Sequence, residues 1–503
     1  MRFFDFLLLS LVAGACKAST VDHATAAASQ QACQRIAGHL GASIVQSSGA
    51  AYDFAASNAW NFANALLRPT CIVFPSQAAH VQAAMREIYR AKSRFAVQAG
   101  SHSAMKGWNN VQDGVLIVFS NMKNATYNPA SDSIILEPGI HWGEATATLS
   151  RFGVAPVGGR VGDVGTGLLL GGGLSFLSPS QGYAADNFKA LDVVLVDGRL
   201  ITATATNQYS DLFRAMKGGA NRFGIVTRYE VQAVHVGTDD ETPFFGGFII
   251  YDGSTAEALS KATAKYVREV NDPQAVLLTT FTTIVLQGVL QTIAEVFLFY
   301  RGTSLPPSIF GDFLAIPALV TQVGPLSYTQ VLATIGPESV NAQRGFVQHM
   351  GASALAGQEQ LYLDALTHYQ NFTNTFMNPA SGAGMNYSTL AFTAVPASQI
   401  AAGRAKGGNV MIPANLKKGF AAVQLAQQFN PGVSAIPSFV QQGIDLLFRQ
   451  VPPSPGLPLY VNECDAGQKV FESYGGYELL KATYRKYDPE RFNVQHCQGP
   501  IGL

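Results

Sequence analysis

The feature that most restricts the fold of this chain is a run of sixteen residues, 158–173 (GGRVGDVGTGLLLGGG), of which eight are glycine. Glycine at this density makes poor helix or strand interior, because it loses the most backbone entropy on folding and has no side chain to pack. It does allow backbone N–H groups to approach a bulky anion such as a phosphate. A second small-residue loop, within 94–103 (RFAVQAGSHS), follows an apolar run and carries His102. Two such loops predict a dinucleotide held along its length.

Length and charge narrow the class of protein. At 503 residues the chain is too long for one ordinary core, so two domains are expected. Only 13% of the residues are charged, 48% are hydrophobic, and 33 basic residues balance 33 acidic ones. This composition is typical of a well-buried enzyme and argues against nucleic acid as a partner.

The N-terminus predicts a secretory signal over residues 1–18, with one arginine, an apolar core and small residues at a cleavage site. A membrane anchor is the alternative, but the apolar run is shorter than the roughly 20 residues that a spanning helix needs. We therefore expect a secreted or secretory-pathway protein with no membrane segment in its mature form. Three glycosylation sequons agree with that route, at Asn124, Asn371 and Asn386.

Cysteine usage fits an oxidising compartment. Removal of Cys16 with the signal leaves four cysteines, which permit three pairings. Because each pair is local in sequence, we predict bonds between Cys33 and Cys71 and between Cys464 and Cys497. Four buried free thiols are the alternative.

The N-terminal half reads as mixed α and β structure. A strand at 68–77, a helix at 78–92 and further strands at 95–100 and 114–120 form a β-α-β opening. Residues 188–204 predict two strands joined by a hairpin at Asp197-Gly198.

The C-terminal half reads as longer strands and helices. The apolar run 275–300 contains too many polar residues for a membrane span and predicts two paired strands on either side of Gly288. The stretch 451–458 (VPPSPGLP) predicts a crossing between domains. The closing segment predicts a strand that carries Tyr460, then a loop and a helix that ends before Asp488.

Together these segments resemble the berberine-bridge-enzyme-like branch of the vanillyl-alcohol-oxidase type of FAD oxidoreductases, in particular its fungal members. The resemblance covers most of residues 30–235 and returns at about 458–493. No single short motif is specific, but their order and spacing over two hundred residues are. The matching pieces are RPTCIVFPSQ, QAGSHSAMKG, EPGIHWGEA, the glycine-rich run with its continuation to YAADN, DLFRAMKGGANRFGIVTRYE, and YVN with YDP.

The resemblance implies an α+β fold. It consists of a PCMH-type FAD-binding domain of two α/β subdomains (19–235) and a substrate domain with an antiparallel sheet covered by helices (236–454). A C-terminal segment (455–503) returns to the FAD-binding domain.

The resemblance also implies which residues hold FAD. The pyrophosphate would lie against the backbone of 99–103 and 162–167, and Gly224 and Ile225 would lie near the adenine half. The expected cofactor-binding residues are Ala99, Gly100, Ser101, His102, Ser103, Gly107, Gly159, Gly162, Val164, Gly165, Gly167, Gly172, Gly224 and Ile225.

His102 matches the histidine that, in the family, bonds covalently to the 8α carbon of the flavin. A neutral imidazole is a nucleophile at pH 7, so the chemistry is sound. The alternative is a loop histidine hydrogen-bonded near a phosphate, with FAD held noncovalently. Members with a doubly tethered flavin have a cysteine where this chain has Val161, so a second thioether is not available. That weighs against a close relationship to the doubly linked oligosaccharide oxidases.

For the catalytic residues, the family's YxN pattern falls on Tyr460 and Asn462. A tyrosine with an ordinary pKa of about 10 acts as a base at neutral pH only if a neighbour favours the phenolate or takes the proton onward. The alternative is that both residues only shape the pocket. Three tryptophans, Trp60, Trp108 and Trp142, are expected to pack in core or loop positions rather than to act as stacking platforms.

The function that these features favour is an FAD-dependent oxidase. It would transfer a hydride from a small metabolite, such as an alcohol, an amine or a secondary-metabolite intermediate, to the flavin, with molecular oxygen as acceptor. A carbohydrate oxidase is the nearest competitor. An FAD-containing cyclase without net redox change and a cofactor-free binding protein are the others. A P-loop GxxxxGK[ST] and finger-type Cys/His metal spacing are both absent from the sequence.

Overall fold

The computed structural model describes residues 25–336 and 344–503. The predicted signal at 1–18 lies outside them. The first described residues, 25–40, are helical and pack on a small N-terminal sheet through Ile36 and Cys33. Four strands form this sheet in the order β1-β2-β4-β3, with β2, β4 and β3 parallel. The elements of this part are β1 (Val45–Gln46), α2 (Ala50–Ser57), α3 (Phe62–Ala65), β2 (Cys71–Val73), α4 (Ala78–Ala91), β3 (Phe95–Gln98) and β4 (Val115–Val118). The predicted β-α-β opening is confirmed.

A second sheet follows, entirely antiparallel, in the order β5-β6-β10-β8-β9. The predicted hairpin is confirmed: β8 and β9 pair across a turn in which Gly198 adopts a φ of 84°. The elements are β5 (Ala125–Asn128), β6 (Ser133–Leu136), α5 (Trp142–Leu149), β7 (Val154–Ala155), α6 (Gly167–Leu170), α7 (Ser178–Gln181), β8 (Phe188–Val194), β9 (Leu200–Thr204), α8 (Ser210–Ala215), β10 (Ile225–Gln232) and β11 (Val234–His235).

The largest sheet has seven antiparallel strands in the order β15-β12-β14-β13-β17-β18-β16. The run 275–300 forms two paired strands, as predicted, with Gln287 and Gly288 at positive φ in the turn. The strands are β12 (Phe244–Asp252), β13 (Ala275–Leu286), β14 (Val289–Tyr300), β15 (Val320–Leu326), β16 (Val347–Leu355), β17 (Met385–Val395) and β18 (Phe420–Phe429).

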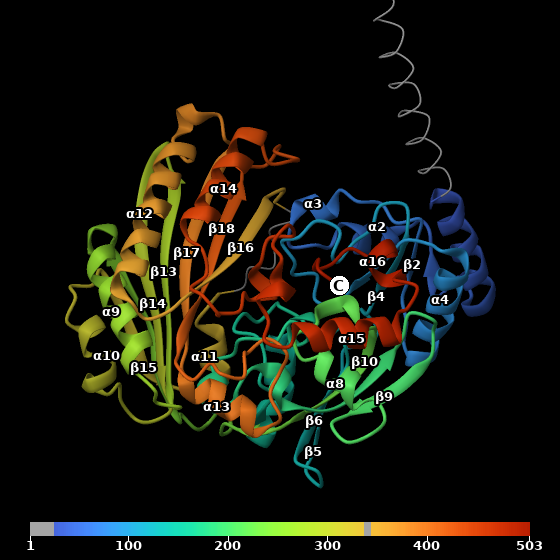
Figure 1. Cartoon of the computed structure of the whole chain (residues 1–503), viewed down its shortest axis with the longest axis horizontal. Coiled ribbons are helices and arrows are strands. Elements are labelled where there is room, and N and C mark those ends of the chain that lie inside the picture. Colours follow the sequence, from blue (N-terminus) through green and yellow to red (C-terminus); the bar gives the residue numbers. More distant parts are fainter. Residues whose placement is uncertain (1–24, 337–343) are drawn as a thin grey trace, which may run out of the picture.

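Helices cover one face of this sheet, and the opposite face turns toward the glycine-rich loops (Figure 1). The covering helices are α9 (Ala256–Glu269), α10 (Pro307–Leu314), α12 (Glu359–Phe376) and α14 (Ser438–Gln450). Two shorter helices lie at its edge, α11 (Tyr328–Ala333) and α13 (Ala397–Ala405). Within the described residues, no helix combines the length and apolar character needed to cross a bilayer.

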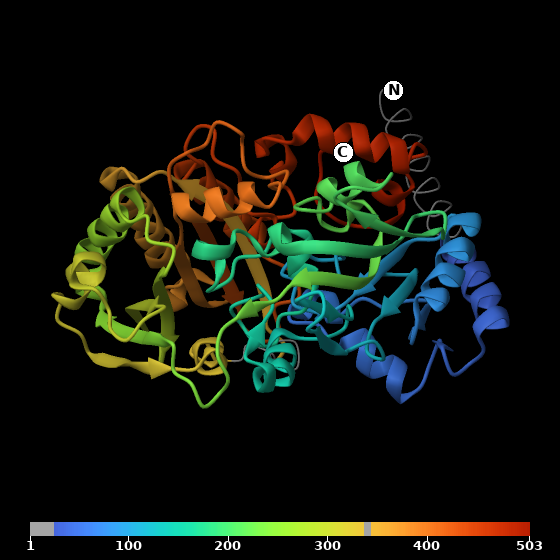
Figure 2. The ribbon, with the colours of Figure 1, turned by 90° about the horizontal axis from the view of Figure 1, so that it is seen from below.

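The C-terminal segment leaves the large sheet and packs on the N-terminal part, through α15 (Tyr477–Tyr487) and α16 (Phe492–His496). Figures 1 and 2 show the large sheet at one end of the molecule and the N-terminal elements at the other. The Phe492 ring lies 4.9 Å from that of Tyr89, and the buried Arg222 donates hydrogen bonds to Asn493 and to the carbonyls of Cys497 and Pro500. Helix α15 ends at Tyr487, directly before Asp488, as predicted.

The cysteine prediction is half confirmed. Cys33 and Cys71 form a disulfide that ties helix 25–40 to β2. Cys464 and Cys497 are both buried free thiols, so their predicted pairing is wrong. Closeness in sequence did not bring them together: Cys464 donates to the carbonyl of Val461, whereas Cys497 lies beside Asn221 and Arg222.

Replacing both Cys33 and Cys71 by alanine is expected to lower the free energy of unfolding by about 3–4 kcal/mol, because the bond closes a loop of 38 residues. Urea denaturation of the wild type and the double variant, each with and without reductant, measures this difference. Reductant should weaken only the wild type. Equal stability of the wild type and the double variant in the absence of reductant would show that the bond contributes nothing.

Candidate active site

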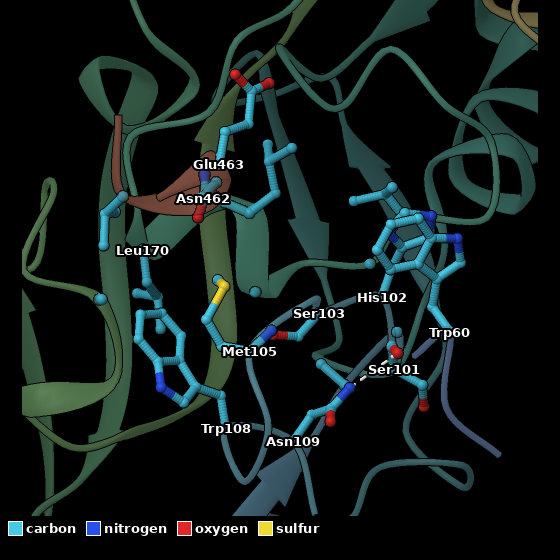
Figure 3. Close-up of a pocket in the computed structure, with 18 of the residues that line it drawn as sticks. Trp60, Ser101, His102, Ser103, Met105, Trp108, Asn109, Leu170, Asn462 and Glu463 are labelled. Carbon is cyan, nitrogen blue, oxygen red and sulfur yellow. Dashed lines mark hydrogen bonds between the residues drawn. The ribbon is translucent and has the colours of Figure 1, made fainter. Parts of the chain in front are cut away.

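The His102 loop is held in a strained, well-supported conformation. It begins where β3 ends, and Ser101 adopts a φ of 62°, a left-handed value that costs energy for a residue other than glycine. Two hydrogen bonds hold the Ser101 carbonyl, from the backbone N–H of Trp60 (3.0 Å) and from Asn109 Nδ2 (2.8 Å) (Figure 3). The geometry fixes the direction in which the next side chain, His102, projects.

The His102 ring is stacked on Trp60, with 4.5 Å between ring centroids and an interplanar angle of 17°. Trp60 is itself buried in a small hydrophobic cluster, as expected, and one face of its ring packs against the His102 imidazole. Burial lowers the pKa of His102 to about 4, although the Asp163 carboxylate opposes this shift. The imidazole is neutral at pH 7, which is the nucleophilic form.

The two small-residue loops cross each other at Gly100 and Gly165. A Cβ added to Gly100 would lie 2.4 Å from the Gly165 nitrogen, and one added to Gly165 would lie 2.5 Å from the Gly100 nitrogen. Gly158 and Gly159 make room in the same way for the Trp142 ring. These glycines therefore allow two segments of the chain to pack closely together. The sequence pattern alone does not distinguish this role from the close approach of a phosphate.

A cavity of about 640 Å³ runs along these loops into the space in front of the large sheet. Twelve of the predicted site residues line it: Ala99, Gly100, Ser101, His102, Ser103, Val164, Gly165, Gly167, Gly224, Ile225, Tyr460 and Asn462. Gly162 lines a second cavity that also borders His102. Gly107, Gly159 and Gly172 line neither cavity. Each faces protein instead, since an added Cβ would meet the side chain of Gln498, Trp142 and Met411, respectively.

The cavity suits an elongated dinucleotide. One end lies between apolar side chains in or directly after strands of both small sheets, Phe95, Val97, Phe119, Val194 and Val196. In the middle, open space surrounds the position that a Cβ on Gly167 would take. Its volume lies within the range of ordinary cofactor sites, about 300–1,000 Å³. The residues present therefore fit FAD, with apolar side chains for an adenine and bare backbone for phosphates.

The YxN residues lie in an extended segment that turns into a short 3₁₀ helix, Val461–Glu463, so the predicted strand at this place is wrong. Tyr460 Oη accepts two hydrogen bonds, from the Leu174 backbone N–H and from Asn462 Nδ2, both 2.9 Å. Asn462 also donates to the Leu168 carbonyl, and Gly171 leaves room for its amide. The end of the glycine-rich run therefore supports the tyrosine.

The hydrogen bonds donated to Tyr460 oppose the effect of burial on its pKa. Burial raises the pKa of the Tyr460 phenol well above its ordinary value, and the Glu463 carboxylate adds to that shift. The hydrogen bonds from Asn462 and Leu174 and the charge of Arg160 favour the phenolate and lower the pKa. They are the kind of neighbours that a tyrosine base requires.

Sequence reasoning missed an ion pair at the cavity wall. Arg160 Nη2 lies 3.4 Å from Glu463 Oε1, and Arg160 Nη1 donates to Thr393 Oγ1 on β17 at 2.7 Å. Burial raises the pKa of Glu463, and Arg160 lowers it. In Figure 3, Glu463 and Asn462 lie on one side of the cavity and His102 and Trp60 on the other. The sequence signal that could have indicated this ion pair is an arginine within a glycine-rich run.

Sequence reasoning also missed the large sheet's contribution. Alternate residues of five of its strands line the cavity, which follows from the two-residue period of a strand. The polar ones carry hydroxyl or amide groups, apart from one acid, Glu295: they are Thr280 and Thr282 of β13, Glu295 of β14, Tyr387 and Thr389 of β17, Gln424 and Gln428 of β18, and Gln348 of β16. Apolar residues of the same strands lie among them, namely Leu278, Phe297, Met350, Ala391 and Ala426.

The fold and the cavity define a flavin-binding oxidoreductase, and comparisons with known proteins agree. The family model described as an FAD binding domain matches residues 69–204. An FAD-linked oxidoreductase of Arthroderma benhamiae is 30% identical over 470 residues, covering 90% of this chain and 91% of that protein. An FAD-dependent monooxygenase of Aspergillus calidoustus is 28% identical over 465 residues, covering 90% and 85%. The chain belongs to the FAD-linked oxidoreductases.

Solved structures share the fold. A xylooligosaccharide oxidase from Myceliophthora thermophila superposes with a TM-score of 0.73 at 17% identity, covering 94% of this chain and 100% of that one. A berberine-bridge-enzyme-like protein from Physcomitrella patens gives 0.70 at 19% identity, covering 91% and 97%. The predicted α+β fold with a large antiparallel sheet is confirmed.

Proposed function

We propose that this FAD-linked oxidoreductase is an oxidase of a small metabolite, an alcohol, an amine or a secondary-metabolite intermediate, with molecular oxygen as the electron acceptor. The observation that carries the proposal is the single cavity that joins the His102 loop, Tyr460 and the inner face of the large sheet. FAD supplies a two-electron acceptor when it is bound. The protein's own groups bind the substrate and remove its proton.

In this proposal Tyr460 takes the proton from the substrate O–H or N–H. The N–H groups of Leu174 and Asn462 stabilise the phenolate, and Arg160 adds a positive charge nearby. Loss of the Asn462 donor should raise the pKa of Tyr460. The pH at which flavin reduction reaches its plateau should therefore rise in Asn462→Leu.

We also propose that FAD is attached covalently, through His102 alone. A neutral, buried imidazole stacked on Trp60 supports this bond. Val161 lines the cavity where a second tether would need a cysteine.

A carbohydrate is the second candidate substrate, because threonine and glutamine side chains on the sheet face suit the hydroxyl groups of a sugar. A panel of alcohols, amines, monosaccharides and oligosaccharides distinguishes the two, with anaerobic bleaching of the flavin and peroxide release in air as readouts. We expect bleaching and peroxide with a non-sugar substrate. Turnover confined to sugars would assign the second candidate, and turnover without bleaching or oxygen uptake would contradict an oxidase.

We propose that the protein enters the secretory pathway. The Cys33–Cys71 bond and the exposed side chains of Asn124 and Asn371 support this. Asn386 is half-buried and accepts a hydrogen bond from Gln428, so it is the poorest of the three glycosylation acceptors. The mass of protein secreted from a eukaryotic host, before and after removal of N-glycans, tests this; an unchanged mass would count against it.

A further inference from the structure

Asp163 is a buried carboxylate that the proposed reaction does not use. Both of its oxygens are buried, and neither has a hydrogen-bond partner among the described residues. An unpaired buried carboxylate is costly, so a native protein retains one only where something offsets its charge. The surroundings of Asp163 therefore indicate what it serves.

The loop that carries Asp163 is fixed on two sides. The Gly162 carbonyl accepts a hydrogen bond from the Gly143 N–H (2.8 Å), and the Val164 carbonyl accepts one from the Trp142 N–H (3.1 Å). These bonds hold the loop on the start of α5. The crossing of Gly100 and Gly165 then presses it against the His102 loop.

The imidazole that this arrangement brings to Asp163 is that of His102. Both residues border the second cavity, together with His141 and Glu144. His141 already has an acidic partner, because its Nδ1 lies 3.2 Å from Glu144 Oε2. The charge of Asp163 acts on His102, where it favours the protonated imidazole. Trp60 fixes the plane of the ring, and the Asp163 charge that acts on this fixed ring favours a proton on the nitrogen that faces it.

We propose that Asp163 is the positioning residue for flavin attachment: as the bond forms, its carboxylate takes up the N–H proton of one His102 nitrogen, while the lone pair of the other nitrogen is directed at the cofactor. This inference rests on the proposed covalent attachment. A second-layer carboxylate of this kind sets the tautomer of an imidazole and offsets the positive charge that forms on it.

The balance of the step shows why a carboxylate is useful. A bond forms between the reacting nitrogen of His102 and the 8α carbon, which loses one proton. The imidazole N–H proton passes to Asp163, and two electrons remain on the cofactor. Molecular oxygen, the acceptor of the proposed function, takes both electrons and two protons as hydrogen peroxide. Without Asp163, the imidazolium would form in a buried site with no counter-charge from this loop.

The test compares Asp163→Asn with a matched control, Glu144→Gln, which removes the other carboxylate that lines the second cavity. Full-length proteins are incubated with FAD in air. Total bound flavin and acid-stable flavin are then measured over time. In Asp163→Asn we expect unchanged total binding and attachment slower by about a hundredfold. Glu144→Gln should attach flavin at the wild-type rate.

Other results would overturn different parts of the proposal. Attachment in Asp163→Asn at the wild-type rate overturns the role of Asp163 and leaves covalent attachment standing. Absence of acid-stable flavin in the wild type overturns attachment itself, and this inference with it. If Asp163→Asn loses total binding, Asp163→Glu decides: recovery of binding and attachment supports the charge, whereas no recovery assigns Asp163 to loop folding and overturns the proposal.

Discussion

Replacing Tyr460 by phenylalanine is expected to slow substrate-driven flavin reduction by about a hundredfold or more, because it removes the group that takes the substrate proton. The ring is buried and the change removes one oxygen atom, so the fold should be retained. Anaerobic stopped-flow reduction with the best substrate from the panel gives the rate. The pH dependence of that rate should lose the limb that belongs to the phenol.

Tyr474 provides the matched control. It is a second buried tyrosine of the same C-terminal segment, it does not line the cavity, and its hydroxyl has no hydrogen-bond partner among the described residues. Tyr474→Phe should reduce flavin at the wild-type rate. A full rate in Tyr460→Phe would leave Tyr460 and Asn462 with a shaping role only.

Gly165→Ala is expected to destabilise the protein by about 1–3 kcal/mol, because the new methyl group meets the backbone of the other loop and one of the loops must move. The added Cβ would lie 2.5 Å from the Gly100 nitrogen and 2.6 Å from its Cα. Displacement of either loop also moves His102 away from the cavity. We therefore expect a lower melting temperature and less acid-stable flavin.

Gly167→Ala, two residues further along, is the control for the loss of stability. Nothing lies within 4 Å of the position that its Cβ would occupy, and the residue begins α6. Alanine is favoured over glycine in a helix by about 1 kcal/mol, so stability should hold or rise slightly. Equal losses in both variants would show that the crossing of the loops does not depend on Gly165.

The architecture followed from local signals. Apolar periodicity predicted α4, the Asp197-Gly198 dipeptide predicted the β8–β9 hairpin, and alternation on either side of Gly288 predicted β13 and β14. Each signal is carried by neighbouring residues. The strand predicted at Tyr460 failed because the backbone of this segment makes local hydrogen bonds and pairs with no strand: the Leu459 N–H donates to Ser473 Oγ, and the Tyr460 carbonyl accepts from the Glu463 N–H.

Much of the site depended on contacts between distant segments, which a single sequence does not record. Twelve predicted residues line the main cavity. They could be predicted because the resemblance to a known family supplied their roles. Arg160 and Glu463 were missed, since their partners lie elsewhere in the chain, and Asp163 was missed because the cavity that it shares with His102 forms only in the fold. The same distance effect made the Cys464–Cys497 pairing wrong, although Cys33 and Cys71, 38 residues apart, do pair.

The most direct test of the central claim is the absorption spectrum of the purified protein before and after acid precipitation, with His102→Ala alongside. We expect visible flavin bands in both folded proteins, with the colour retained in the wild-type pellet and released from the variant. Correctly folded wild-type protein that stays colourless after incubation with FAD, or that releases all its flavin into the acid supernatant, would contradict it.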